Sequence, residues 1–435
     1  MNYDEAIRYI EDTAKFGSKL GLERTEMILN KLGNPHKKIK TIHIAGTNGK
    51  GSTTAMVTSV LIESGYSVGT YISPYIEEFE ERIQVNNTNI PKADLADVIT
   101  RLSKVIKEVA EEGYGNPTQF EIITCAGFMY FYEKKVDYAV VEVGLGGRLD
   151  STNVISPEIC AIASISLDHM QILGDTLEKI AGEKAGIIKE KTPVVLYPQG
   201  ESVTKVIEAA AALKNAPVIK VNKDNALYQE LVEGEDRFYQ RIRIKGKDSY
   251  ELLLPLLGVH QIQNCNVVIN ICEALKEKGV NITRESIISG IKNVRWPGRM
   301  EVMGRKPIVL LDGAHNIDGI TKLKESIENY FKYDKLILVL GILADKQVDD
   351  MIKVICPMAE RVIAVTPHSE RGELCNELKD KIQQYEIPCE AFEDYGEAYD
   401  KAKEYCSEES LLVISGSLYM VGDMRKLIRH KNEII

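Results

Sequence analysis

Residues 41–52, TIHIAGTNGKGS, set the architecture expected of this chain of 435 residues. The apolar residues 41–45 predict a short strand, and the glycine-rich residues after it lead into a predicted helix at 50–64. Glycines at such a turn let backbone N–H groups converge on a phosphate, and the N-terminus of the helix adds a partial positive charge. Lys50 supplies a mobile cation beside them. The pattern therefore predicts a phosphate-binding loop from Gly46 to Ser52.

The spacing of this loop differs from the common pattern G-x-x-x-x-G-K-[ST]. Residue 44 is Ile where that pattern has its first glycine, and Gly51 separates Lys50 from the hydroxyl of Ser52. The alternative interpretation is a glycine-rich turn with a surface lysine. The strand before the loop and the helix after it favour a variant phosphate loop.

Strands and helices alternate on both sides of a boundary that we place at Arg295–Arg299, where Pro and Gly interrupt the periodic patterns. Two short helices and a connector are expected in residues 1–40. The rest of the N-terminal part is expected to hold strands at 67–72, 138–143, 160–165 and 193–196, helices at 92–112, 118–134, 176–189 and 203–212, and an antiparallel appendage at 226–254.

Beyond the boundary the alternation becomes regular. Helical stretches separate four apolar runs, at 307–312, 335–340, 361–366 and 410–415. This spacing predicts parallel strands with crossover helices. We therefore expect an α/β protein with a phosphate-loop domain at 1–295 and a smaller Rossmann-like α/β domain at 296–435.

Composition narrows the functions that fit. A formal charge of -10 argues against nucleic acid as a partner, because binding a polyanion relies on clustered Lys and Arg. Eight cysteines without a C-x-x-C pair predict reduced, mostly buried thiols. The first residues lack a signal-peptide pattern, and the longest apolar run, 336–344, is too short to span a bilayer. We expect a soluble cytoplasmic protein with no nucleic-acid or membrane partner.

Polar residues stand at the ends of several predicted strands, where ligands bind in open α/β sheets. Glu142 lies in an apolar run, and a buried acid is costly unless it is paired or holds a metal such as Mg²⁺. Ser73 and His169 also follow strands, with a turn and a structural histidine as the alternatives. Residues 312–316 end another strand, with a helix-capping turn as the alternative. By pattern alone, Lys184 is a solvated lysine on an amphipathic helix.

A set of strings follows a fixed order over most of the chain: AGTNGKGS at 45–52, Ser73-Pro74 with ERI at 81–83, VEVGLGGRLDSTN at 141–153, EKAGIIK at 183–189, His260-Gln261 with Asn264, WPGR at 296–299 and DGAHN at 312–316. Together they resemble one family, the folylpolyglutamate synthase and dihydrofolate synthase enzymes of the Mur ligase superfamily. The resemblance implies a Mur-ligase-like ATPase domain followed by a Rossmann-like glutamate-ligase domain.

The resemblance also implies a role for each matching residue. ATP would be bound by Asn48, Gly49, Lys50, Gly51, Ser52, Asn264, Arg299 and Asp312. Mg²⁺ would be held by Ser73, Glu142 and His169, helped by Lys184 as a carbamate formed with CO₂, and a monovalent cation is part of the same expectation. The folate would be lined by Arg82, Thr118, Gln119, Phe120, Glu121, Leu149, Asp150 and Ser151, and the incoming glutamate by His315 and Ser417. The catalytic residues would be Lys50, Lys184 and His315.

The sequence departs from the family's pattern at three positions. Tyr75 stands where the family usually has His after Ser-Pro, which affects the expected folate pocket. Cys265 replaces a common Ala, and Ile317 replaces a common Pro. We interpret these two as packing changes.

The implied activity is an ATP-dependent ligase that adds L-glutamate to a folate carboxylate through an acyl phosphate. The substrate would be tetrahydrofolate, dihydropteroate or both, and the enzyme would act as a monomer on small molecules. A Mur-type amino-acid ligase acting on a different carboxylate is one alternative, although only about 45 residues precede the loop, too few for a UDP-binding domain. A nucleotide-switch protein is another, but residues 222–225 fail the N-K-x-D guanine signature.

Overall fold

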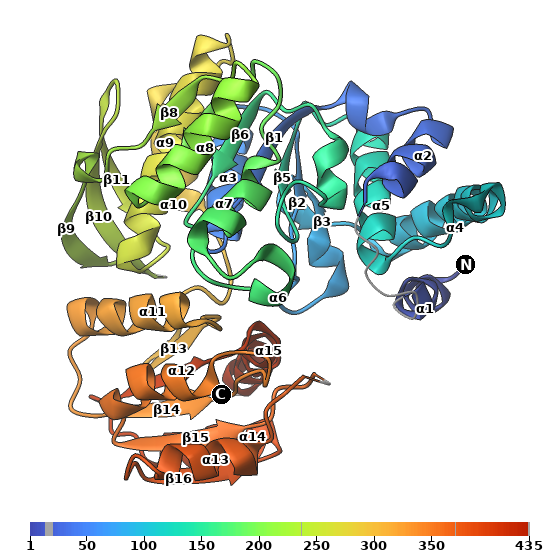
Figure 1. The fold of residues 1–435 in the computed structure, drawn as a ribbon. Coiled ribbons are helices and arrows are strands. Elements are labelled where there is room, and N and C mark those ends of the chain that lie inside the picture. The colour runs from blue at the N-terminus through green and yellow to red at the C-terminus, as the bar shows by residue number, and fades with distance from the viewer. Residues whose placement is uncertain (14–20, 236, 370, 434–435) are drawn as a thin grey trace. The chain divides into compact units, whose positions relative to one another are not determined.

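The computed structural model describes residues 1–13, 21–235, 237–369 and 371–433 (Figure 1). They form two compact units. The N-terminal unit comprises Met1–Leu227, Ile242–Leu252 and Gln263–Val294, and the C-terminal unit comprises Tyr228–Arg241, Leu253–Ile262 and Arg295–Ile435. The connector expected between the first two helices falls largely on 14–20, outside the described residues. The division into functional domains at 295/296 stays a prediction, because compactness alone does not define a functional domain.

An eight-stranded sheet forms the centre of the N-terminal unit, in the order β4-β3-β2-β5-β1-β6-β7-β8. The six strands from β2 to β8 in this order pair in parallel, and β3 pairs antiparallel with β2 and β4. Their apolar runs suit parallel strands that are buried on both faces. The strands are β1 (Lys40–Ala45), β2 (Val68–Tyr71), β3 (Ile83–Val85), β4 (Thr88–Asn89), β5 (Tyr138–Glu142), β6 (Ile159–Ile162), β7 (Val194–Leu196) and β8 (Val218–Lys220).

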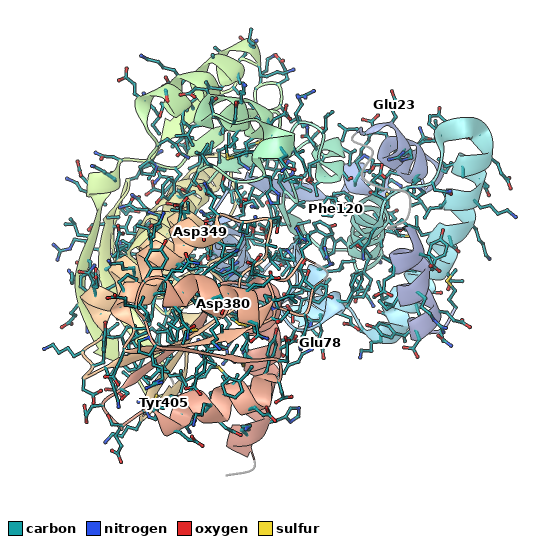
Figure 2. The ribbon with its side chains drawn as sticks, turned by 60° about the horizontal axis from the view of Figure 1, so that its bottom comes forward. Glu23, Glu78, Phe120, Asp349, Asp380 and Tyr405 are labelled. Atoms are coloured by element: carbon teal, nitrogen blue, oxygen red, sulfur yellow. The ribbon has the colours of Figure 1, made fainter. Side chains whose placement is uncertain are left out.

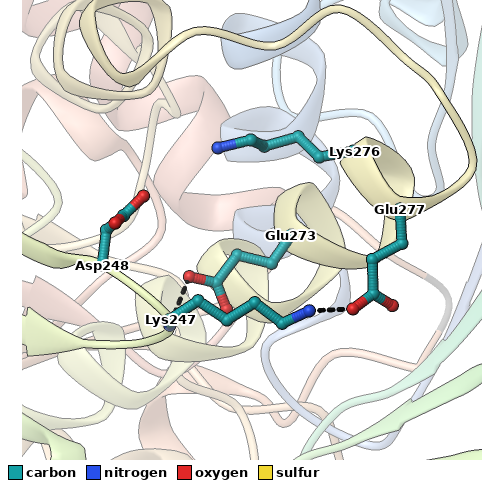
Figure 3. Close-up of a pocket in the computed structure, with 5 residues that line it drawn as sticks. All are labelled: Lys247, Asp248, Glu273, Lys276 and Glu277. Carbon is teal, nitrogen blue, oxygen red and sulfur yellow. Dashed lines mark hydrogen bonds and ion pairs between the residues drawn. The ribbon is translucent and has the colours of Figure 1, made fainter.

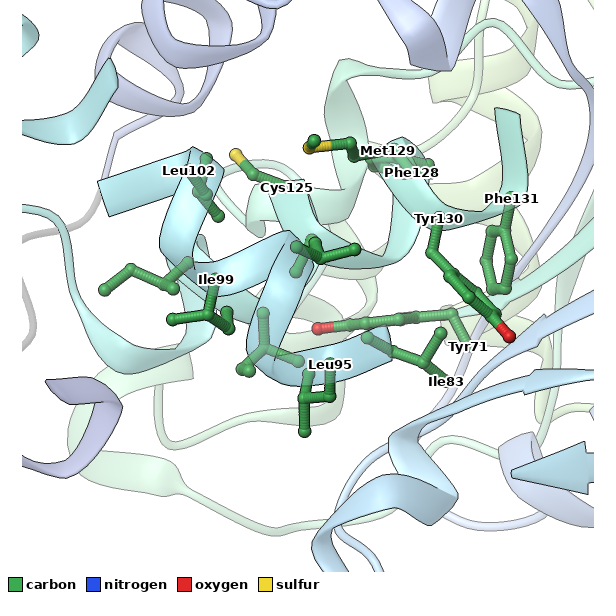
Figure 4. Close-up of a cluster of buried hydrophobic side chains, with 14 of the residues drawn as sticks. Tyr71, Ile83, Leu95, Ile99, Leu102, Cys125, Phe128, Met129, Tyr130 and Phe131 are labelled. Atoms are coloured by element: carbon green, nitrogen blue, oxygen red, sulfur yellow. The ribbon is translucent and has the colours of Figure 1, made fainter. Parts of the chain in front are cut away.

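Helices cover this sheet (Figure 1). Among them α4 and α8 each bury one apolar stripe, whereas α3 and α5 are buried on nearly all sides. One hydrophobic cluster joins Tyr71 and Ile83 to side chains of α1, α2, α4 and α5 (Figure 4). Another joins β6 and β7 to α7 and α8. The helices are α1 (Tyr3–Asp12), α2 (Glu23–Lys31), α3 (Lys50–Glu63), α4 (Lys92–Val109), α5 (Gln119–Glu133), α6 (Met170–Leu173), α7 (Leu177–Ala185), α8 (Glu201–Leu213), α9 (Val259–Glu277) and α10 (Arg284–Asn293).

The appendage predicted at 226–254 is a separate three-stranded sheet in the order β11-β10-β9. Tight turns join its strands, with the Gly234 N–H donating to Arg237 O and the Gly246 N–H donating to Asp248 O. Alternating burial along β10 explains the hairpin-like spacing of its sequence. The strands are β9 (Ala226–Glu233), β10 (Phe238–Lys245) and β11 (Ser249–Leu254).

The sheet of the C-terminal unit has six strands in the order β12-β13-β17-β14-β15-β16. All neighbours pair in parallel except β12 and β13, which confirms the predicted parallel strands of a Rossmann-like domain. The sequence reading missed the first and last of these strands. The strands are β12 (Glu301–Arg305), β13 (Ile308–Asp312), β14 (Leu336–Leu340), β15 (Arg361–Val365), β16 (Cys389–Phe392) and β17 (Leu411–Ser415), and the helices are α11 (Ile317–Tyr330), α12 (Val348–Ile355), α13 (Cys375–Gln383), α14 (Tyr395–Glu404) and α15 (Leu418–Glu433).

The cysteines and the apolar runs behave as expected. All eight cysteines lie in the described part of the chain as free thiols, and seven of them are buried. Burial raises the pKa of several of these thiols, Cys160 among them, to about 12. Across the described ranges, no helix is both long and apolar enough to cross a membrane.

Candidate active site

The glycine-rich loop joins the end of β1 to the start of α3. Gly49 precedes the helix with a φ of 83°, a left-handed conformation that favours glycine. A Cβ at this position would lie 2.6 Å from the Oδ1 atom of Asn264. Strand, turn and helix therefore follow one another as the sequence predicts, and the positive φ and this close approach favour glycine at the last position of the turn.

The loop is held in place by the segment that follows β6. The Thr47 N–H donates to Ser164 O at 2.7 Å, and the Thr47 hydroxyl donates to Ser166 O at 3.0 Å. The Ser166 N–H donates back to Thr47 Oγ1 at 3.1 Å, and Asn48 Nδ2 donates to Ser166 Oγ at 3.2 Å. These bonds fix the loop independently of any ligand.

Two lysine side chains converge on one carbonyl of this loop. Lys50 Nζ donates to Gly46 O and to Thr47 O, both at 3.0 Å, and Lys184 Nζ donates to Gly46 O at 2.9 Å. Burial, and then the charge of Lys50, lower the pKa of Lys184 to about 7. A substantial fraction of this amine is therefore neutral near pH 7.

The pattern-based interpretation of Lys184 as a solvated lysine was wrong, since only 4% of the residue is exposed. It shares the buried face of α7 with Ile180, Ala181 and Ala185. This spacing along a helix could have revealed its burial from the sequence.

The acid predicted at a strand end is buried there. Glu142 is the last residue of β5, is 5% exposed and pairs in register with Ile44 of β1. On the other side, Val141 pairs with Tyr71 of β2, two residues before Ser73. The structure therefore brings Ser73 and Glu142 to neighbouring ends of parallel strands, on the same edge as the loop.

His169 follows β6 toward the same edge. It precedes α6 with a φ of 48°, and its N–H donates to Asp168 Oδ1 at 2.9 Å. Its side chain is 40% exposed. The side chain is therefore partly accessible to solvent, and the choice between a ligand and a structural histidine stays a prediction.

The donor atoms at this edge could hold a magnesium ion only together with ligands from water and phosphate. Within the described residues, no group of three or more His, Cys, Asp and Glu side chains is placed to hold a metal. The hard oxygen donors are the Glu142 carboxylate and the Ser73 hydroxyl. Mg²⁺ binds through one or two carboxylates and takes its remaining ligands from water and phosphate. The residues fit a nucleotide-bound Mg²⁺ and do not form a protein-only cage.

Some of the residues expected to line the folate at the start of α5 form hydrogen bonds within the protein instead. Thr118 Oγ1 accepts from the Glu121 N–H at 3.2 Å, and Glu121 Oε2 accepts from the Thr118 N–H at 2.7 Å. Arg24 Nη2 also donates to Glu121 Oε2, at 2.9 Å, and both side chains are nearly buried. Glu121 therefore anchors the N-terminus of α5, whereas Gln119 and Phe120 are half-buried.

Phe120, labelled in Figure 2, is near the start of α5. Its ring lies 6.1 Å from that of Tyr71, and a Cβ at Gly144 would come within 2.4 Å of it. Gly144 is thus required for the ring to lie against the end of β5.

The turn that follows β5 is closed by Asp150. Its Oδ2 accepts from the Leu145 N–H at 2.8 Å, and its Oδ1 accepts from the Thr152 N–H at 3.0 Å and the Thr152 hydroxyl at 2.5 Å. Burial raises the pKa of Asp150, while these hydrogen bonds lower it. Ser151 is buried and Leu149 half-buried. The carboxylate of Asp150 therefore holds the turn together.

Arg82 is stacked against aromatic rings. Its guanidinium lies 5.2 Å from the ring of Tyr75 and 5.4 Å from that of Phe79. The Tyr75 that departs from the family's pattern therefore orients this arginine through a cation–π contact. The preceding loop is closed by Glu81, which accepts from the N–H groups of Ile76, Glu77 and Glu78.

The predicted site residues of the C-terminal unit gather at the end of β13. Asp312 is 6% exposed and accepts from the Met300 N–H at 2.9 Å and the Ala314 N–H at 2.8 Å. Burial raises the pKa of Asp312, and the charge of Arg299 lowers it. A Cβ at Gly313 would come within 2.4 Å of Arg299 Nη1, so this arginine lies beside the turn.

His315 and Ser417 lie beside Asp312. His315 Nδ1 lies 2.9 Å from Gly313 O, and since a carbonyl oxygen only accepts, Nδ1 carries a proton. Asp312 pairs in register with Ser415, two residues before Ser417, whose buried hydroxyl has no hydrogen-bond partner among the described residues. The capping alternative for 312–316 also holds in part, because Asn316 Oδ1 accepts from the Gly319 N–H and caps α11.

A pocket of about 260 Å³ lies elsewhere, lined by charged side chains of a hairpin turn and of α9 (Figure 3). The Lys247 N–H donates to Glu273 Oε1 at 2.7 Å, and Lys247 Nζ pairs with Glu277. The two contacts of Lys247 fasten the turn to the helix, so we assign the pocket a structural role.

Sequence reasoning missed three residues that support the site: Arg24, His43 and Thr152. Arg24 meets Glu121 across 97 positions of sequence, and His43 meets Thr152 across 109. Neither pair leaves a local spacing signal, although His43 inside an apolar strand was a polar residue in need of a partner.

Two family models match this chain. A family model described as the Mur ligase middle domain matches residues 44–272, and one described as the Mur ligase, glutamate ligase domain matches residues 298–418. The dihydrofolate synthase/folylpolyglutamate synthase of Bacillus subtilis is 38% identical over 432 residues, which cover 98% of this chain and 99% of that protein.

Two solved structures are similar over nearly the whole chain. The folylpolyglutamate synthase of Thermotoga maritima has a TM-score of 0.86 at 37% identity, covering 99% of this chain and 97% of that one. The Mycobacterium tuberculosis folylpolyglutamate synthase, solved with ADP and AMPPCP, has a TM-score of 0.89 at 28% identity, covering 98% and 99%.

Fold, phosphate loop and family models together define an ATP-dependent ligase of the Mur ligase class. The chain belongs to the dihydrofolate synthase/folylpolyglutamate synthase family, as the resemblance of its motifs predicted. The predicted arrangement of an ATPase domain fold followed by a smaller α/β fold is confirmed with it.

Proposed function

We propose that this chain uses ATP to join L-glutamate to the carboxylate of a folate, and that it accepts both dihydropteroate and reduced folates. The observation that carries the proposal is the position of Lys50, whose Nζ donates to the carbonyls of Gly46 and Thr47 beside the N-terminus of α3. Positive charge at a helix N-terminus stabilises phosphate. The names of the relatives supply the folate and the glutamate.

Amide formation needs activation because a carboxylate is a poor electrophile. The carboxylate oxygen of the folate attacks the γ-phosphorus of ATP, the bond to ADP breaks, and an acyl phosphate forms. The amine of glutamate then attacks the acyl carbon, and inorganic phosphate leaves. Lys50 neutralises charge on the transferring phosphoryl group, which is the main catalytic contribution in such reactions.

His315 is the proposed proton acceptor for the glutamate amine. Its Nδ1 proton is held by Gly313 O, so Nε2 carries the lone pair of the neutral ring. The buried Ser417 hydroxyl, which lacks a partner among the described residues, would bind a carboxylate of the glutamate. Arg299 and Asp312, with Asn264 of the N-terminal unit, are the proposed contacts to the remainder of ATP. These roles define functional domains at 1–295 and 296–435.

Ser73, Glu142 and His169 are the proposed holders of Mg²⁺, which when bound would neutralise charge on the phosphate oxygens. Lys184 is the proposed carbamate. Only a neutral amine adds to CO₂, with release of a proton, and the lowered pKa of Lys184 supports such a reaction near pH 7. The carbamate would turn a buried cation into an anion that helps to hold the metal. A bound monovalent cation is part of the same proposal.

The central test is folate- and glutamate-dependent ADP formation by Lys50→Ala and Glu142→Ala. We expect each variant to lose about 100-fold or more of the rate, because each loses a charge that acts on the phosphates. Lys205→Ala is a matched control, since Lys205 forms only an exposed ion pair with Glu201. Near-normal rates in either test variant would contradict the assignment.

The choice of substrate is tested separately. Mass spectrometry of products from dihydropteroate, and from tetrahydrofolate, should show addition of glutamate in both cases. ADP release indifferent to folate and glutamate would instead support the nucleotide-switch alternative. We further propose that the enzyme is a monomer, which light scattering of the pure protein would test.

A further inference from the structure

A buried line of hydrogen bonds runs from β1 to the turn that follows β5. His43 Nε2 lies 2.8 Å from Thr152 Oγ1, and Thr152 Oγ1 lies 2.5 Å from Asp150 Oδ1. His43 and Thr152 have no exposed surface, and Asp150 is 6% exposed. None of the roles proposed above uses His43 or Thr152.

The direction of these hydrogen bonds follows from the chemistry of the groups. Both oxygens of Asp150 accept from backbone N–H groups, as they do in a carboxylate, so the single hydroxyl proton of Thr152 is donated to Asp150. The Thr152 oxygen then accepts, which requires the proton of His43 to lie on Nε2. Consistent with this, burial and the charge of Lys189 lower the pKa of His43 to about 3, so its ring is neutral. The His43 Nδ1 atom has no partner among the described residues.

The far end of this line closes the turn that carries Leu149 and Ser151. Asp150 Oδ2 accepts from the Leu145 N–H at 2.8 Å, so one carboxylate joins the start of the turn to its end. Asn153 adds two hydrogen bonds to the same turn, because its Nδ2 donates to Arg148 O at 3.1 Å and to Gly186 O at 3.0 Å. The orientation of Asp150 therefore sets the shape of the whole turn.

We propose that His43 and Thr152 are positioning residues for the folate-lining turn 144–151, acting through Asp150. The inference rests on the proposed function, because only that assigns this turn to the folate. The His43 Nε2–H, held on strand β1, donates to the Thr152 hydroxyl. That hydroxyl donates to Asp150, whose carboxylate fixes the turn. The phosphate loop at the end of β1 keeps its own support from Ser164 and Ser166, so ATP binding does not depend on this line.

The test compares Thr152→Val with Thr152→Ser. Valine keeps the branched shape and removes the hydroxyl, whereas serine keeps the hydroxyl. We expect Thr152→Val to raise the KM for the folate substrate about tenfold with the KM for ATP nearly unchanged, because an Asp150 oxygen loses a charge-assisted hydrogen bond. Thr152→Ser should stay close to wild type. His43→Leu should follow the valine variant, and His43→Gln, which keeps an N–H donor, should restore much of the affinity.

Thr58→Val is the control that distinguishes a general loss of buried hydrogen bonding from a specific effect on the folate-lining turn. Thr58 and Thr70 form a buried hydroxyl pair at 3.1 Å in the same unit, away from the turn. This control should lower the melting temperature and leave the folate KM unchanged. Equal effects of Thr152→Val on both substrates, or equal folate KM values for the valine and serine variants, would overturn the proposal.

The tautomer gives a readout independent of activity. In protein labelled with ¹⁵N-histidine, His43 should appear as a neutral ring protonated on Nε2 down to the lowest pH at which the fold persists. A proton on Nδ1 would contradict the relay even if the enzyme is active. Failure of the proposed function looks different, since wild-type protein would then show no folate-dependent ADP formation at all.

Discussion

The segments that follow β1 and β13 are of the same kind, but the start of the helix is held differently in each. Each strand is followed by a glycine-containing turn and a helix. At β13, Asp312 accepts from two backbone N–H groups and Asn316 caps α11. At β1, in the part of the chain that the structure describes, no side chain caps α3 at Gly49, and two lysines point to the loop instead. A helix N-terminus left without a side-chain cap and supplied with the Lys50 cation is suited to phosphate, whereas a capped one is suited to holding its own turn.

The largest effect is expected from Gly49→Ala. The new Cβ would meet Asn264 Oδ1 at 2.6 Å in a left-handed conformation, so the turn or Asn264 must shift. We expect ADP formation to fall about 100-fold or more, since small displacements at a phosphate site are costly. Steady-state kinetics and ATP binding by calorimetry would measure it.

Gly65→Ala is the matched control. Gly65 has a similar φ of 89°, and no described atom lies within 4 Å of a Cβ built there. It should lose about 1 kcal/mol of stability from backbone strain alone, with activity retained. If both variants bind ATP like wild type, the turn at β1 is no more demanding than an ordinary helix end.

The sequence predicted the turn at β1 better than the environment of the lysine beside it. Strand, glycines and helix are local, so their pattern is visible within a dozen residues. The burial of Lys184 depends on Gly46, which lies 138 positions away, and on the packing of α7. The strands β12 and β16 were missed for a different reason: they lie at the two edges of the sheet, where most of their residues are only half-buried and leave no apolar run in the sequence.

The folate-lining residues show the same limit more sharply. Glu121 and Asp150 were predicted to meet substrate from the resemblance of their motifs, and those roles stay predictions. Their carboxylates are occupied by a helix cap and a turn, contacts that require Arg24 and Thr152. A motif marks which residues matter, but only the packed structure distinguishes a ligand from a residue that positions one.

The next largest effect concerns the buried amine beside the loop at β1. The folded-state pKa of Lys184 is about 7, below its ordinary value of 10.5. Between these values the unfolded chain binds the extra proton, so the free energy of unfolding rises with pH as the penalty for burying this cation is relieved. Lys184→Met should remove that slope, giving a variant whose stability advantage over wild type shrinks as pH rises from about 7 to 10.

Urea denaturation in buffers free of CO₂ would measure this slope without carbamate formation. Lys179→Met provides the comparison on the same helix, because the Lys179 side chain is 62% exposed. An identical pH dependence for both variants would show that Lys184 is not held as a buried amine.

The smallest effect is expected at the capped end, and it tests the other half of the comparison. Asn316→Ala removes the acceptor for the Gly319 N–H and should lower the free energy of unfolding by about 1 kcal/mol, whereas Asn316→Ser keeps a capping oxygen and should lose much less. Denaturant midpoints at constant m-value would measure both. If alanine and serine are equally stable, the cap does not hold the turn, and the contrast between the two strand ends must rest on Asp312 alone.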